Sequence, residues 1–219
     1  MSARETILAA VRRAGVPAVE QPEIPAAWPA ARAGRAGRDA GQLSLALPPD
    51  AGGADLVRRF VENLRAVGGS AVQLLGPEVL AVAAAAQVAA LVEPGGGVVS
   101  SVPGLAISTL TLGAEPSRER LDQIELAVIP GRFGVAENGA VWVDEADLVH
   151  RALPFVAQHL AIVLPKREIV ADMHAAYRRL PRPLPGYGVF ISGPSKTADI
   201  EQALVVGAQG PRSLVVFLV

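Results

Sequence analysis

Short apolar runs that alternate with helical segments constrain the fold of this chain more than any other feature. The runs at 98–101, 124–129, 159–164 and 213–219 carry few polar residues. A strand with one face in water would show polar residues at every second position. Strands buried on both faces are typical of parallel sheets, whose crossover connections place helices on either side. We therefore expect an α/β fold with a mainly parallel central sheet flanked by helices.

The segments between these runs have the spacing of helices. Ala54–Val67 carries apolar residues three and four positions apart and ends at a Gly-Gly pair, as an amphipathic helix does. Val79–Val92 is rich in Ala and Val and carries no charge, so we expect a buried helix. Further helices are expected at 167–180 and 197–206, and further strands at 70–75 and 188–192.

A hairpin is expected at 133–143. Its two apolar runs flank Glu137-Asn138-Gly139, and the Asn-Gly pair is a strong signal for a tight turn. Glu137 would then stand beside a tight turn.

The first 42 residues differ in composition from the rest. A short helix is expected at 4–14, and the stretch after it is rich in Pro, Ala, Gly and Arg without periodicity. We interpret residues 1–42 as an N-terminal helix and arm, and residues 43–219 as one α/β domain. The N-terminal helix lacks the pattern of a signal peptide, and no apolar stretch suits a membrane span, so a cytoplasmic protein is expected.

Charge and cysteine content argue against several classes of function. The 20 basic and 21 acidic residues give a net charge of −1, so there is no long-range attraction to nucleic acid. With no cysteine, the chain has no thiolate nucleophile and no ordinary ligand for an iron–sulfur cluster. His150, His159 and His174 lack the paired spacing of metal ligands, and we predict no metal site.

Ser192–Glu201 is the first candidate ligand site. The expected strand ends at Ser192, and the expected helix begins near Thr197. Backbone N–H groups at that helix N-terminus, together with Lys196, would bind a carboxylate or phosphate. Asp199 would oppose an anion there, so a capped turn without a ligand is the alternative. The predicted ligand contacts are Ser192, Gly193, Ser195, Lys196, Thr197 and Asp199, with Gln209 added if its loop faces this segment.

Two segments carry a resemblance to a known family. Ser192–Glu201, followed by Gly207–Pro211 and an apolar strand, resembles the C-terminal signature of the lactate-utilisation protein C family, which has a LUD domain. Phe133–Ala140 is similar to the other recurrent segment of that family. Gln209 stands where a His is common in the family. The resemblance covers roughly residues 43–219.

This resemblance implies a fold of the ribose-5-phosphate isomerase and CoA-transferase-like type (NagB/RpiA/CoA transferase-like). It also implies a role in oxidising L-lactate to pyruvate together with two iron–sulfur partner proteins. Lactate oxidation needs an electron acceptor, and this chain has no cysteine and no dinucleotide fingerprint. We therefore expect no cofactor in this chain, iron–sulfur clusters in the partners, and a small anionic ligand here: lactate, pyruvate, or a phosphate or CoA compound.

Glu137, Asn138 and Gly139 form the second candidate site. CoA transferases of the implied fold have a nucleophilic Glu in a similar Glu-Asn-Gly setting, and a carboxylate can attack a thioester to form an anhydride. Glu137 would then serve a stand-alone enzyme of the CoA-transferase or phosphosugar-isomerase type. The alternatives are an exposed hairpin turn, a contact from Asn138 to a ligand, or a module that senses a metabolite without converting it.

Overall fold

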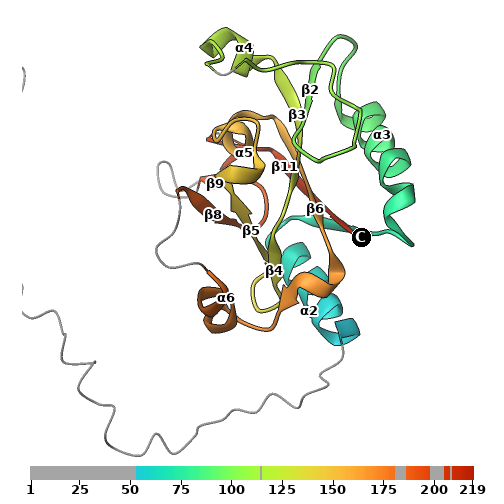
Figure 1. The fold of residues 1–219 in the computed structure, drawn as a ribbon, viewed down its shortest axis with the longest axis vertical. Helices are drawn as coiled ribbons and strands as arrows, with labels where there is room; N and C mark the ends of the chain where they lie inside the picture. The colour runs from blue at the N-terminus through green and yellow to red at the C-terminus, as the bar shows by residue number, and fades with distance from the viewer. Residues whose placement is uncertain (1–52, 114, 181–185, 198–204, 208) are drawn as a thin grey trace, which may run out of the picture. The chain divides into compact units, whose positions relative to one another are not determined.

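The computed structural model of the protein describes residues 53–113, 115–180, 186–197, 205–207 and 209–219. Five strands form a parallel sheet in the order β1 (Ser70–Gln73), β11 (Ser213–Leu218), β6 (His159–Leu164), β3 (Ile124–Pro130) and β2 (Gly97–Ser100) (Figure 1). This sheet confirms the expected fold class. The N-terminal helix and arm expected in residues 1–42 lie outside the described residues.

A second sheet has the strand order β7 (Ile169–Val170), β4 (Phe133–Val135), β5 (Ala140–Asp144) and β8 (Gly188–Ile191). Strands β4 and β5 form the predicted hairpin. The α-helices within the described residues are α2 (Gly53–Ala66), α3 (Leu80–Leu91), α4 (Arg118–Asp122), α5 (Leu153–Val156) and α6 (Met173–Arg179). No helix in these stretches is long and apolar enough to cross a bilayer.

The parallel sheet is buried on both faces because its side chains alternate between two apolar clusters. One face packs against α3 through Leu126, Val128, Ala161, Val215 and Phe217. The other face packs against α2 and the second sheet through Ala127, Ile129, Leu160, Ile162, Val216 and Leu218. This alternation explains why the strands read as uniformly apolar runs.

The second sheet also has two apolar faces. Val141 and Val143 belong to the same cluster as α2, whereas Phe133 and Trp142 belong to a separate cluster with Ala176 of α6. Consecutive residues of β5 therefore point to opposite faces, as strand geometry requires.

Helix α3 is present where a helix was expected, but the prediction that it is buried is wrong. A 3₁₀ turn at Pro77–Val79 precedes it, Ala84 is its fully buried residue, and Val82 is 72% exposed. Because this helix is apolar on every side, its sequence carries no polar face to mark the side in water. Exposed apolar side chains are common on protein surfaces, and alanine has little surface to expose.

The helix expected at 167–180 begins later than predicted. Lys166–Glu168 form a 3₁₀ turn, and Ile169–Val170 form strand β7, which pairs with β4. Helix α6 begins after Asp172, whose carboxylate accepts the Ala175 N–H at 2.7 Å. Ile169 is buried in the main core, so tertiary pairing overrides the local helical pattern.

The helix expected at 197–206 is contradicted at both of its described ends. Residues Lys196–Thr197 form β9 and Val205–Val206 form β10, and the two pair in antiparallel fashion. Residues 198–204 lie outside the described part. Thr197, Val205 and Val206 are β-branched, which favours extended backbone.

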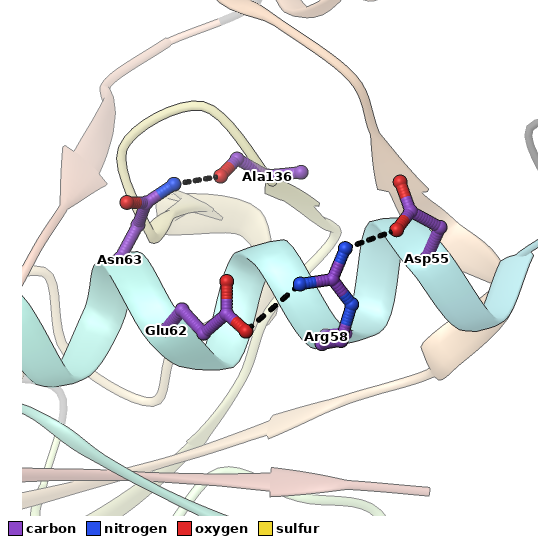
Figure 2. A network of polar contacts seen from close by, with 5 residues as sticks. All are labelled: Asp55, Arg58, Glu62, Asn63 and Ala136. Carbon is purple, nitrogen blue, oxygen red and sulfur yellow. Dashed lines mark hydrogen bonds and ion pairs between the residues drawn. The ribbon is translucent and has the colours of Figure 1, made fainter.

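The turn between β4 and β5 packs directly on the backbone of α2. Gly139 has φ of +67°, and a Cβ at this position would lie 2.5 Å from the backbone nitrogen of Leu64. The Asn63 side-chain amide donates a 2.7 Å hydrogen bond to the carbonyl oxygen of Ala136, as Figure 2 shows. Glycine is required here both by the left-handed backbone and by the close approach.

Replacing Gly139 should therefore destabilise the domain strongly. Gly139→Ala is expected to lower the free energy of unfolding by about 3 kcal/mol or more, because the left-handed conformation is strained and two backbones must also move apart. Urea denaturation measures the loss. Gly95→Ala is the control, since Gly95 has φ of +91° with nothing within 4 Å, and it should cost about 1 kcal/mol. Equal losses would contradict the role of the close approach.

Candidate functional site

Two of the segments singled out from the sequence meet in the structure. The Ser192 hydroxyl donates a 2.8 Å hydrogen bond to the carbonyl oxygen of Asn138, across 54 positions of sequence. The cause is strand pairing: β8 ends just before Ser192, β5 starts just after the hairpin turn, and Val141 lies opposite Ile191 in the antiparallel register. The side chain of Asn138 accepts the Ala140 N–H at 3.0 Å and so closes the turn.

The residues after Ser192 pass the carboxyl-terminal end of α2. Gly193 has φ of +77°, and a Cβ there would lie 2.6 Å from the carbonyl oxygen of Val67. The ammonium nitrogen of Lys196 lies 3.4 Å from the position that a Cβ on Gly68 would occupy. The last carbonyls of a helix attract cations, so this placement gives Lys196 a structural explanation that needs no ligand.

Glu137 contacts α6. Its side chain is exposed, and one carboxylate oxygen accepts the Met173 N–H at 2.8 Å. Asp172 accepts a second N–H of the same helix, so two carboxylates serve the first turn of α6. Such contacts satisfy backbone donors that have no partner inside the helix. The geometry supports the structural interpretation of Glu137 over the nucleophile.

Removing this contact should weaken α6 without unfolding the domain. Glu137→Ala is expected to lower the free energy of unfolding by roughly 0.5–2 kcal/mol, the usual loss for a helix cap. Chemical denaturation gives the value, and Glu115→Ala supplies an exposed glutamate outside α6 for comparison. Two variants with the same stability as the unsubstituted protein would rule out the capping role.

Ser195 and Gln209 line one cavity of about 220 Å³. The backbone joins their two loops, because the Ser195 N–H donates to the Pro211 carbonyl at 2.8 Å and the Gly207 N–H donates to the Ser195 carbonyl at 2.9 Å. The other walls are mainly apolar and come from α5, β6, β8 and β11: Pro154, Phe155, Leu160, Val189, Phe190, Ile191 and Leu214. Gly193 also borders this cavity.

The predicted contacts therefore do not share one pocket. Glu137 faces α6, Asn138 and Ser192 join the hairpin to β8, and Ser195 and Gln209 reach the cavity. Thr197 lies in strand β9, and Asp199 is outside the described residues. Because Thr197, the expected start of that helix, lies in strand β9, the described residues give no support to an anion site at a helix N-terminus there.

Sequence reasoning missed the apolar walls of this cavity. Phe155 and Phe190 come from separate elements, and neither stands in a pattern that distinguishes it from an ordinary apolar residue. In the described part of the chain, no group of three His, Asp or Glu side chains is placed to hold a metal ion.

His159 stands at the start of β6 and shares a 2.8 Å hydrogen bond with the Ser213 hydroxyl. Burial lowers the pKa of its imidazole below the ordinary value of 6.5, and the Arg212 cation lowers it further. The unfolded chain therefore binds this proton more readily than the folded one. Above about pH 6.5 the imidazole is neutral in both the folded and the unfolded chain, and it does not reduce the free energy of unfolding. As the pH falls below about 6.5 the unfolded chain takes up the proton first, and the free energy of unfolding decreases.

Acid should therefore destabilise the unsubstituted protein more than a His159→Asn variant. Urea denaturation at pH 7.5 and at pH 5 gives the change in the free energy of unfolding for each protein. His174→Asn, at an exposed position of α6, is the control. If His159→Asn and the unsubstituted protein lose the same stability between these two pH values, the His159 imidazole does not contribute to the loss of stability in acid.

The fold defines an α/β domain with a five-stranded parallel sheet, to which a smaller mixed sheet is joined. The sequence profile of the LUD domain family matches residues 105–219, which is more than half of the chain. The chain belongs to the LUD domain family.

Similar proteins agree with this assignment. A protein named lactate utilization protein C from Shouchella clausii is 36% identical over 104 residues, which cover 43% of this chain and 45% of that protein. One of the same name from Deinococcus radiodurans is 32% identical over 126 residues, covering 53% and 58%. The chain thus matches about half the length of these curated relatives. The crystal structure of a DUF162 family protein from Deinococcus radiodurans shares the fold, with a TM-score of 0.52 and 19% identity, covering 76% of this chain and 97% of that one.

Proposed function

We propose that this chain is a non-redox component of an L-lactate oxidation system, acting in the cytoplasm with iron–sulfur partner proteins. Family membership carries the proposal, since the matching relatives include several named lactate utilization protein C. The contribution of this chain is to bind a small 2-hydroxy or 2-oxo acid in the cavity beside Ser195 and Gln209.

The size and lining of the cavity support a ligand of this class. Its volume of about 220 Å³ is below the range of roughly 300–1,000 Å³ usual for drug-sized ligands, so a three-carbon acid suits it better. A hydroxyl donor on Ser195 and amide donors on Gln209 can serve a carboxylate or an adjacent oxygen. Pro154, Val189 and Ile191 in its lining provide an apolar surface for a methyl group.

The absence of cysteine supports the division of labour with partners. Oxidation of a 2-hydroxy acid releases two electrons, which a redox centre must receive. The chain offers no thiolate for an iron–sulfur cluster of the ordinary type. In this proposal the partners carry the electrons, and this chain binds or positions the acid.

Ligand binding is tested by thermal unfolding with L-lactate, pyruvate and an acyl-CoA. A ligand that binds the folded state adds roughly 2.7 kcal/mol of stability at a hundred times its Kd. We expect one of the two acids to raise the melting temperature, and Ser195→Ala to reduce that rise. Ser192→Ala is the matched control, because it removes a hydroxyl bonded to Asn138 outside the cavity. No rise with either acid, or an equal reduction in both variants, would refute the cavity as the site.

The partner hypothesis is tested by affinity purification of the tagged chain from cells grown on L-lactate. Iron–sulfur proteins, recognised by visible absorbance and iron content, should co-purify, and the assembly should oxidise L-lactate with an artificial electron acceptor. A chain that purifies alone, and whose deletion leaves growth on L-lactate unchanged, would contradict the proposed role.

A further inference from the structure

We propose a second binding site, for an organic phosphate of nucleotide size, in the groove between α2 and the segment that follows β6. The groove has a volume of about 570 Å³, within the range of roughly 300–1,000 Å³ typical of ligand pockets. None of its lining residues borders the smaller cavity, so this inference does not depend on the proposed function.

The lining of this groove is strongly cationic. It includes the four cations Arg58, Arg65, Lys166 and Arg167 and one carboxylate, that of Glu62. This excess contrasts with the whole chain, whose net charge is −1. A concave surface with one sign of charge concentrates ligands of the opposite sign.

The acidic side chains on α2 neutralise one of these cations. Arg58 pairs with Asp55 and with Glu62, the latter at 2.9 Å (Figure 2). The positive charge that faces the groove therefore comes chiefly from Arg65, Lys166 and Arg167. Arg167 lies 3.4 Å from Glu168, but that carboxylate also bonds Arg179, so its charge is shared.

The groove lies at the carboxyl ends of parallel strands. Gln73 is the last residue of β1, and Lys166 follows β6 after Pro165, on the two sides of β11. Open α/β sheets bind their ligands outside the carboxyl ends of their strands. The Lys166 ammonium is anchored by donating to the Leu74 carbonyl, and an ammonium has two further protons to donate.

The ligand class follows from the charge and from the apolar residues of the groove. A ligand with a single carboxylate cannot pair with three cations at once, whereas a di- or triphosphate can. The planar guanidinium groups of the arginines also suit the paired oxygens of a phosphate. Val57 and Val61 add apolar surface along α2, and the Gln73 amide can donate and accept hydrogen bonds. This combination fits a phosphate chain attached to a ring, as in a nucleoside diphosphate.

The test is isothermal titration of the full chain with ADP, with inorganic phosphate as a second probe. Arg167→Glu should weaken ADP binding about tenfold or more, and Arg65→Glu should do the same, because each reverses a charge at the phosphates. Binding should also weaken on going from low salt to roughly 0.3 M salt.

The matched control is Arg118→Glu. Arg118 and Arg167 are 89% and 85% exposed, and each lies within 4 Å of one carboxylate of its own segment. The charge change is the same, but Arg118 is outside the groove, so its variant should bind ADP within twofold of the unsubstituted protein. Melting temperatures establish that all three variants are folded.

Four results would overturn the proposal. One is the absence of ADP binding by the unsubstituted protein. Another is an equal loss in Arg118→Glu, which would indicate attraction by overall charge. The third is phosphate binding as tight as ADP binding, and the fourth is displacement of ADP by an acidic peptide that binds more tightly, since either would give the groove a different ligand.

Discussion

The close contact between α2 and the β4–β5 turn determines where the rest of the candidate site lies. Gly139 allows the turn to touch the backbone of Leu64, and Asn63 bonds the carbonyl of Ala136 beside it. With the hairpin held there, β5 can pair with β8, and that pairing brings Ser192 to the turn. The chain then continues past Val67 into the loop that carries Ser195. Because Gly139 has no side chain, the hairpin can pack against α2, and this packing helps to position the Ser195 loop more than fifty residues along the chain.

The two hollows near α2 differ in their lining. The carboxyl-terminal end of α2 supports the loops that lead to a small, largely apolar cavity with two polar groups. One side of this helix lines a larger groove with an excess of cations. Lys196, the cation nearest to Ser195 in sequence, lies near the end of α2, and Glu137 serves the first turn of α6. Glu137 therefore has a structural contact and Lys196 a structural location, and the predicted polar residues at the small cavity, Ser195 and Gln209, are uncharged.

Much of the fold could be predicted because local sequence encodes it. The apolar runs of β3, β6 and β11 show burial on both faces, and Asn138-Gly139 shows the hairpin. The errors arise where distant partners decide the conformation. The local sequence of Ile169 and Val170 predicts a helix, but pairing with β4 makes them a strand. Thr197 was expected to start a helix, but it pairs with Val205 in a strand. The cavity could not be predicted, since its walls come from a helix, three strands and two loops that are far apart in the sequence.

The proposed function depends on the binding of a small hydroxy or oxo acid beside Ser195 and Gln209. The most direct measurement is a titration of the ¹⁵N-labelled protein with L-lactate and with pyruvate, followed through its backbone amide resonances. The proposed binding site predicts saturable shifts concentrated in residues 189–195 and 209–214, with those of α2 around Arg58 little changed. Shifts confined to α2 and Arg167, or no saturable shift with either acid, would contradict it.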